Sequence, residues 1–458
     1  MSQLVLGLVG CAIGIALMLA DMWAQGLGIA LAAIAGPQLL RNPDLMAVTT
    51  LALAPIQIDL GSSITPVKLW APLALASAMF DSARTGNWRL PPPALLAGFG
   101  GFCLWGLVSE TNAMTIAPEA LLLAMGATLL QVYLLWRAAA TPQGLKRVAM
   151  AYSVLIIAVA ISVPIMGPVT NGEELGTRYA GLCGEPNWTG ETAARVLPLT
   201  AALVLDRLSG TKLRLLGVVA SASALYVQFA SASRGGTLAM LLGMAAFVLA
   251  MADSLRSALR GLGAVVVVIA VLLLLAPTSY SYRVLGSFGF GEYSTVEYGD
   301  ITSGRVALNS MGVEAFFESP WLGLGTSGWQ QRNMSLTGMA TAIHNGPLSA
   351  LVSFGLPALV AYVACVVSAL LAGFRALRKA GPYRIYVAAF MAHFASVMVS
   401  SQTLSDLIRN VVWVAPGLAL AAAHVVDLYS SGAIAAEAHQ AAEPSRPRLP
   451  LTLPTPYL

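Results

Sequence analysis

Three arginines and one histidine are the residues of this largely apolar chain whose types and positions suit binding or catalysis. They are Arg178 in TRYAGLCGEPNW, Arg234 in SASRGGT, Arg305 in TSGRVAL and His344 in TAIHNGPL. A guanidinium can hold phosphate oxygens with two parallel hydrogen bonds, and a neutral imidazole can accept a proton near pH 7. These residue types are suited to anion binding and to general-base chemistry.

Two of the arginines have a structural interpretation beside the functional one. Arg234 lies between two apolar runs, where Gly235 and Gly236 are expected to make a tight turn. It is either a snorkelling arginine that meets any lipid phosphate or an anion clamp. Arg178 lies in a Gly-rich connector and either joins that clamp or pairs with one of the glutamates at 173–174. Both alternatives stay open on the sequence.

Arg305 and His344 are each expected at the start of a helix. A helix N-terminus carries a partial positive charge and favours acids in its first turn, so Arg305 there strengthens an anion site. The same field disfavours an imidazolium, which keeps His344 neutral unless its role is only structural. Asn187, which follows Arg178, and Asn345, which follows His344, are the candidate supporting residues.

The composition shows what must position these side chains. The chain has 458 residues, of which 57% are hydrophobic and 10% charged, and its mean hydropathy is +0.75. Soluble domains carry about 25% charged residues, so this is an integral membrane protein. Apolar stretches of helical length recur along the chain without the alternation of barrel strands. The expected fold is all-α, a polytopic bundle of transmembrane helices.

The apolar stretches predict twelve to fourteen spans, because the second is short for a bilayer. They are expected at 3–20, 24–38, 44–59, 64–80, 94–109, 115–136, 147–166, 191–207, 213–231, 235–252, 260–276, 345–371, 384–401 and 407–427.

Basic residues predict the orientation of these spans. They gather in the connectors at 82–93, 137–147, 206–214, 253–260 and 372–384, which are separated by even numbers of spans. We therefore expect those connectors and both termini to be cytoplasmic. The opposite connectors contain no lysine, so the arginines at 178, 234 and 305 need a reason other than orientation.

The longest external connector, residues 278–344, is expected to contain an amphipathic helix. Ser303 is its predicted cap, Pro320 its stop, and Val306, Val313, Phe316 and Phe317 its apolar stripe. Such a helix would lie over the bundle as a lid or in the membrane surface. The expected organisation is an N-terminal transmembrane scaffold at 1–166, a membrane segment with the first external loop and the SRG turn at 167–277, the large loop at 278–344, C-terminal membrane helices at 345–429 and a disordered tail at 430–458.

No cofactor, metal site or nucleic-acid partner is expected. The four cysteines lack CxxC spacing, and no cluster of His and Asp indicates a bound metal. Gly323, Gly325 and Gly328 match GxGxxG, but no strand–helix unit surrounds them, which argues against a dinucleotide fingerprint.

The order of these motifs resembles the O-antigen ligase superfamily, which includes O-antigen polymerases and protein O-oligosaccharyltransferases. SASRGGTLAML is followed by a long loop with TSGRVAL and ESPWLGLGTSGW, and then by AIHNGPLSALVSFGLPALV. RYAGLCGEPNW resembles an earlier element of the family. The resemblance covers residues 170–370 well, and the first 165 residues match only as a hydrophobic scaffold.

The resemblance implies a metal-independent, inverting glycosyltransferase of the GT-C type in the bacterial inner membrane, with a periplasmic active site. Its donor would be a glycan on undecaprenyl pyrophosphate and its acceptor lipid A-core, with membrane lipids around both. Arg234 and Arg305, helped by Arg178, would hold the pyrophosphate, and Arg305 and His344 would be catalytic. His344 would take the proton from the acceptor hydroxyl.

Three alternatives remain. A polymerase would use a second lipid-linked repeat as acceptor, and a protein transferase would use a Ser or Thr side chain; ligation is favoured by the chain length and compact external loop. A transporter or flippase belongs to a different class. It would need acids at mid-membrane, whereas Glu119, Glu191 and Asp406 lie near span ends.

Overall fold

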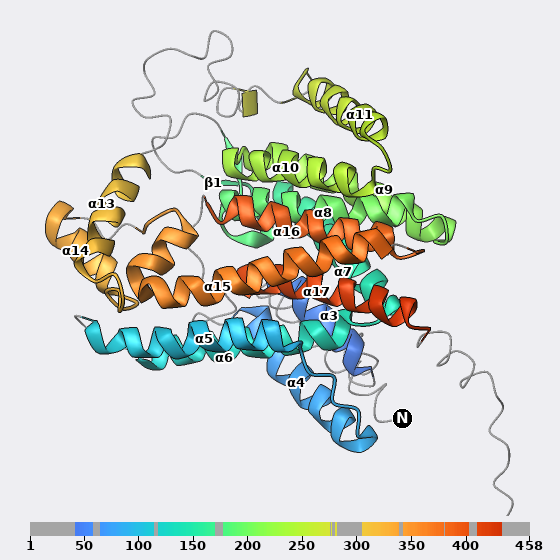
Figure 1. The fold of residues 1–458 in the computed structure, drawn as a ribbon. Coiled ribbons are helices and arrows are strands. Elements are labelled where there is room, and N and C mark those ends of the chain that lie inside the picture. The colour runs from blue at the N-terminus through green and yellow to red at the C-terminus, as the bar shows by residue number, and fades with distance from the viewer. Residues whose placement is uncertain are drawn as a thin grey trace, which may run out of the picture.

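The computed structural model describes residues 42–57, 65–113, 118–169, 177–274, 276, 280–281, 305–338, 342–379, 381–402 and 410–432. Over these residues the protein is a bundle of helices (Figure 1). The helices are α3 Pro43–Leu53, α4 Pro66–Thr85, α5 Pro93–Ser109, α6 Pro118–Ala139, α7 Pro142–Met166, α8 Pro186–Leu205, α9 Thr211–Ser231, α10 Arg234–Met251, α11 Leu255–Leu274, α13 Arg305–Glu318, α14 Gly328–Thr337, α15 Gly346–Lys379, α16 Arg384–Ser400 and α17 Asn410–Ser430. Short 3₁₀ turns, η1 Glu110–Asn112 and η2 Gly181–Cys183, and a two-stranded ribbon of β1 Pro168–Val169 with β2 Arg178–Tyr179 complete the fold.

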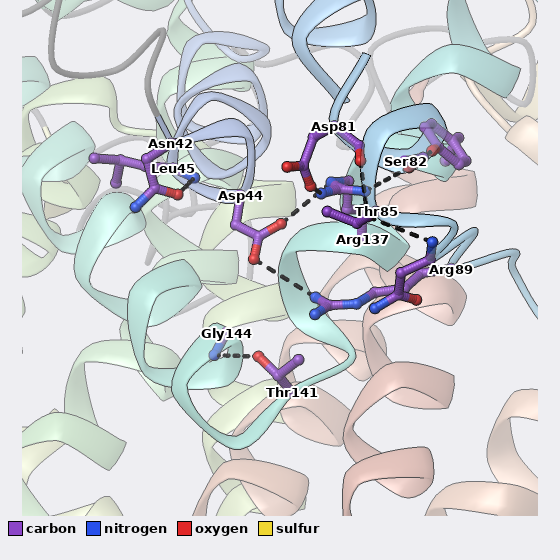
Figure 2. Close-up of polar contacts among 12 residues, drawn as sticks. Asn42, Asp44, Leu45, Asp81, Ser82, Thr85, Arg89, Arg137, Thr141 and Gly144 are labelled. Carbon is purple, nitrogen blue, oxygen red and sulfur yellow. Dashed lines mark hydrogen bonds and ion pairs between the residues drawn. The ribbon is translucent and has the colours of Figure 1, made fainter. Parts of the chain in front are cut away.

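Prolines set where the first helices begin. Each of α3 to α8 starts with a proline, whose fixed φ suits the first helical position and which has no N–H to leave unpaired there. Side chains just before two of these prolines complete the ends. Asn42 accepts a hydrogen bond from the Leu45 amide at 3.1 Å, and Thr141 accepts one from the Gly144 amide at 2.9 Å (Figure 2).

The helices pack around α8 and α15. The first of these contacts α7, α9, α10 and α16, while α15 contacts α5 and α17. In Figure 1 the longest helices run side by side, and α13 and α14 lie beyond one end of them, next to the start of α15. The core between the helices is closely packed around fully buried aromatic side chains such as Trp413, Phe354 and Phe390. This end of the bundle is therefore where the long connector meets the membrane helices.

The all-α polytopic fold expected from the sequence is confirmed. Each predicted span from 44–59 onward coincides with a helix, and six of the described helices are long and apolar enough to cross a membrane. They lie at Pro93–Asn112, Pro142–Met166, Thr211–Ser231, Arg234–Met251, Gly346–Lys379 and Val412–Ser430. The spans at 3–20 and 24–38, the cap at Ser303 and most of the tail from 430 lie outside the described residues. The total number of crossings stays a prediction.

An ion-pair network joins α3, α4 and α6 at the end predicted to be cytoplasmic (Figure 2). The Arg137 side chain is only 5% exposed and contacts Asp81 at 2.5 Å and Asp44 at 3.2 Å, from Nη2 to Oδ2 and from Nε to Oδ1. Its Nη1 also donates to the Ser82 hydroxyl at 2.8 Å, and Arg89 reaches the second oxygen of Asp44 at 3.5 Å. Arginines read from the sequence as orientation signals therefore also fasten three helices together.

A break in α15 receives the segment of residues 319–326, which we call the clasp. Gly355 has a φ of 75°, and a Cβ there would lie 2.1 Å from the Trp321 carbonyl oxygen. Gly323 has a φ of 70°, and its Cβ would meet the backbone of α15 at 2.4 Å. The two backbones come close enough for the Leu324 amide to donate to the Val352 carbonyl at 2.8 Å. These glycines serve close backbone packing, in agreement with the argument against a dinucleotide site.

Contacts to the end of α5 and to η1 hold the other side of the clasp. The Trp105 indole N–H donates to the Trp321 carbonyl at 2.9 Å. The Glu110 carboxylate accepts from the Thr326 amide at 2.7 Å and also from the Thr326 hydroxyl. The clasp is thus fixed between two membrane helices, and the helices α13 and α14 on either side of it are anchored with it.

The helix predicted in the long connector exists as α13, and it contacts the rest of the protein through Ala315 and Phe316 and not through the whole predicted stripe. Val306, Val313 and Phe317 of the predicted stripe are exposed. Ala315 is buried in a small cluster against α14 and α15, with Phe316 packed beside it. The expected stripe was placed by the positions of large apolar residues alone. A small residue packs more closely against α15, because it lets the backbones approach.

Candidate active site

The start of α8 organises the first half of the candidate site. The Glu185 side chain caps this helix by accepting from the Asn187 amide at 3.2 Å. The Asn187 side-chain oxygen in turn accepts from Arg178 Nη2 at 2.7 Å, and Arg178 Nε donates to the Ser231 carbonyl at 3.0 Å. Arg178 is 5% exposed. It therefore links the start of α8 to the end of α9; the glutamates at 173–174 lie outside the described residues.

The turn between α9 and α10 places Arg234 beside these residues. Ala232, the residue that follows α9, adopts a left-handed φ of 45°. This conformation ends α9 and turns the chain toward α10. Ser233 then caps α10, because its Oγ accepts from the Gly236 amide at 3.1 Å. Arg234 is the first residue of α10 and is half-buried. Its backbone position is therefore fixed by the same turn whose Ser231 carbonyl binds Arg178.

The glycines after Arg234 have a different role from the expected one. Gly235 and Gly236 do not make the turn; they lie in the first turn of α10. A Cβ on Gly236 would lie 2.7 Å from the Gly190 carbonyl carbon, so the glycine allows α8 and α10 to touch. The Gln228 side-chain amide fastens the turn by donating to the Ser233 carbonyl at 3.0 Å. The sequence could not show this, because it does not show which helices cross.

The second half of the site is at the start of α15. Asn345, one of the predicted supporting residues, caps this helix by accepting from the Leu348 amide at 3.0 Å. The preceding residue, His344, is half-buried, and its Nδ1 has no hydrogen-bond partner among the described residues. Asn345 therefore fixes the backbone on which His344 is carried.

Two charged groups act on the His344 imidazole. Burial lowers the pKa of His344, the nearby Arg305 guanidinium lowers it further, and the Glu185 carboxylate opposes both by raising it. The net direction is down from the ordinary value, so the neutral ring is favoured at pH 7. Because these forces weaken with distance, Arg305 at the start of α13 and Glu185 at the start of α8 both lie near His344.

The helices α8, α13 and α15 thus begin near one another, and α10 begins against the first turns of α8. Arg234 and Arg305 are the first residues of their helices. A helix N-terminus carries unpaired N–H groups and a partial positive charge, and an arginine placed there adds to the field. The structure brings the predicted residues to the same end of the bundle, as an arrangement able to hold an anion beside a neutral histidine.

Residues 219–363 match the family model described as O-antigen ligase. This segment of the chain belongs to the O-antigen ligase family. It runs from α9 into α15 and contains Arg234, Arg305 and His344, whereas Arg178 and Asn187 precede it. No curated protein matches the chain. The family expected from the sequence is confirmed over the matched segment, and the chain is a multi-pass membrane protein with an O-antigen ligase domain.

Sequence reasoning missed several polar residues next to the O-antigen ligase domain. Glu185 was assigned no role from the sequence, although its carboxylate raises the pKa of His344. Glu191 and Arg195, four residues apart on α8, form an ion pair of 2.6 Å between side chains that are 1% and 14% exposed. A signal for this pair was present, because opposite charges at this spacing inside an apolar run are costly unless they meet.

Proposed function

We propose that the protein transfers a glycan from undecaprenyl pyrophosphate to lipid A-core on the periplasmic side of the inner membrane. The single observation that carries this proposal is that Arg305 at the start of α13 and Glu185 at the start of α8 lie close enough to His344 to shift its pKa. An anion site and a proton acceptor side by side are what transfer from a pyrophosphate carrier needs. The O-antigen ligase match of residues 219–363 supports the same reaction class.

Arg178, Arg234 and Arg305 bind the donor pyrophosphate in this proposal. Arg178 is oriented by Asn187 and the Ser231 carbonyl, and the other two guanidinium groups leave from the first residues of α10 and α13. Charge grows on the pyrophosphate as the bond to the sugar breaks. Preorganised donors stabilise that charge without rearranging during the reaction.

His344 acts as the general base in one inverting displacement. The acceptor hydroxyl gives its proton to the neutral imidazole, and its oxygen forms the new bond to the anomeric carbon. The bond from that carbon to the pyrophosphate oxygen breaks, and undecaprenyl pyrophosphate leaves with the bonding electrons. The lowered pKa of His344, caused by burial and Arg305, keeps the ring in the form that can take the proton.

His344→Ala and Arg305→Ala test this assignment. Purified protein in liposomes is given the lipid-linked donor and lipid A-core, and glycan transfer is followed by the mobility of the product. We expect each variant to lose at least about a hundredfold in rate, because a positioned base or an oxyanion donor contributes about that much. The melting temperature of each variant should stay near that of the wild type.

Arg332→Gln is the matched control, because Arg332 lies in the same connector and pairs with Glu318, from side chains that are 18% and 51% exposed. It should transfer normally. Near-normal transfer by His344→Ala or Arg305→Ala would refute the site. Replacing lipid A-core with a second lipid-linked repeat or a Ser-containing peptide separates ligation from polymerisation and protein glycosylation; product from only one of those substitutes would refute the acceptor assignment.

A further inference from the structure

A buried ion pair on α8 connects to the start of α15 through the end of α16. The Arg195 Nη2 that meets Glu191 at 2.6 Å also donates to the Ser400 hydroxyl at 3.0 Å. Ser400 is the last residue of α16 and is fully buried. Its own hydroxyl proton points to the Val397 carbonyl at 3.2 Å, which leaves the oxygen lone pairs for Arg195. One guanidinium nitrogen thus holds two helices together.

Further polar contacts fasten the same two helices. Pro198 lies inside α8 and has no N–H, so the carbonyl four residues before it, on Ala194, loses its helical donor. The Ser396 hydroxyl of α16 lies 3.4 Å from that carbonyl oxygen. The His393 ring nitrogen Nδ1 lies 2.9 Å from the Arg195 carbonyl oxygen. The register of α16 against α8 is therefore set at successive turns and ends at the Arg195–Ser400 contact.

The residue that follows α16, its C-cap Ser401, connects α16 to the start of α15. The Ser401 carbonyl accepts from the Gly346 amide at 2.7 Å. Gly346 is the first residue of α15 and comes two residues after His344, with the cap Asn345 between them. An unbroken path of hydrogen bonds and backbone runs from the Arg195 guanidinium through Ser400 and Ser401 to Gly346 and His344.

We propose that Arg195, held by Glu191, is a positioning residue that sets where the His344 imidazole stands relative to the donor site. The helix α8 carries both the Arg178–Asn187 contact at its start and Arg195 two turns later. The positions of the proposed donor-binding residues and of the proposed general base are therefore both set by α8. This inference rests on the proposed transfer reaction.

The alternative is that Glu191 and Arg195 only neutralise one another. A buried ion pair is weak evidence for stability, because the cost of removing two charges from water offsets their attraction. The double variant Glu191→Gln/Arg195→Met separates the two readings. It leaves no unpaired buried charge and keeps similar side-chain volumes, so the helix stays packed while the bond to Ser400 is lost.

The experiment measures donor-dependent transfer and thermal unfolding of the full-length protein in liposomes. We expect the double variant to unfold near the wild-type temperature, to keep its KM for the donor within about twofold, and to lose about tenfold or more in kcat, because small displacements of a reacting group are costly. Ser400→Ala, which removes the acceptor alone, should lower kcat in the same way to a smaller extent. Arg195→Lys should keep the charge pairing with Glu191 but should not keep the wild-type kcat. A single ammonium group cannot reproduce the planar set of donors with which the guanidinium contacts both Glu191 and Ser400.

The matched control is the double variant Lys379→Met/Asp427→Asn. It removes an exposed ion pair of 2.8 Å between α15 and α17. It should leave both kcat and KM unchanged. Wild-type kcat in the double variant or in Ser400→Ala would overturn the inference. If His344→Ala is inactive while those variants are fully active, only the positioning role of Arg195 fails; if the wild type itself transfers nothing, the proposed function fails first.

Discussion

Arginines at the two ends of the bundle meet different kinds of acceptor. At the end predicted to be cytoplasmic, Arg137 lies between the carboxylates of Asp44 and Asp81 (Figure 2). At the other end, Arg178 donates to a backbone carbonyl and to the Asn187 amide oxygen, both of which are neutral. A carboxylate ties a guanidinium to the fold by charge, whereas a neutral oxygen orients it. The residue type is the same, but Arg137 is held by two opposite charges, whereas these two neutral oxygens orient Arg178 for the donor-binding role that we propose.

Arg137→Met should have the largest effect and should act on stability. Removing this cation leaves two carboxylates facing each other without their shared partner. Breaking a buried pair costs about 3 kcal/mol at the lower end of the usual range, which applies because both carboxylates are about a quarter exposed. Thermal unfolding in detergent measures the loss.

The control for this prediction is Arg84→Met. Arg84 pairs with Asp81 from a side chain that is 71% exposed, and exposed pairs contribute less than about 1 kcal/mol. Transfer per folded molecule should be normal in both variants. Equal melting temperatures for Arg137→Met and Arg84→Met would contradict the prediction that the buried Arg137 contacts stabilise the fold more than the exposed Arg84 pair does.

Asn187→Asp should give Arg178 the kind of charged partner that Arg137 has. It replaces the neutral acceptor of Arg178 with a carboxylate of nearly the same shape. The protein should keep its fold, while the affinity for the anionic donor falls about tenfold, since a close charge pair of this kind is worth about 1.4 kcal/mol or more. The measurement is the KM for the donor in the transfer assay.

Asn187→Ala is the companion variant, because it removes the contact without adding charge. It should weaken donor binding less than Asn187→Asp does. The opposite order would mean that orientation, not charge, dominates at Arg178.

The smallest expected effect is a shift in pH dependence. His344 must be neutral to act as base, so the rate should fall as the pH drops through its pKa, which burial and Arg305 hold below 6.5. Glu185 raises that pKa, and Glu185→Gln therefore moves the acidic limb to still lower pH. A shift of a few tenths of a pH unit is expected, since partly exposed charges interact weakly. The rate profile between pH 4.5 and 8 measures it, and Glu314→Gln on exposed α13 should leave it unchanged.

Local signals in the sequence predicted the helices well. The spans expected at 94–109, 213–231 and 384–401 match α5, α9 and α16 within two residues at either end. Apolar length decides whether a segment can form a membrane helix, and proline favours the position where the helix starts. These properties belong to neighbouring residues, so the sequence alone contains them.

The site was predicted as a set of residues but not as an arrangement. The structure places Arg305 near His344 and joins Arg178 to Asn187, contacts that the sequence did not specify, and the roles of these residues stay predictions. The prediction that Gly236 makes the turn was wrong. A glycine is needed there because α10 contacts Gly190 on another helix. Arg195 went unnoticed for the same reason. Its partner Ser400 is 205 residues away in sequence, and helix crossings at that separation leave no local pattern.

The break in α15 has a consequence for exchanging parts between related proteins. The clasp at 319–326 and the residues around Gly355 fit backbone against backbone, with no side chain between them that could adjust. A graft that takes the external connector without the first part of α15 would join two surfaces that were not shaped together. A transferable cassette therefore has to carry the clasp together with the start of α15 through Leu356, and the recipient must keep Trp105 and Glu110, which bind the other side of the clasp. Chimaeras made to test the proposed acceptor should keep these contacts together.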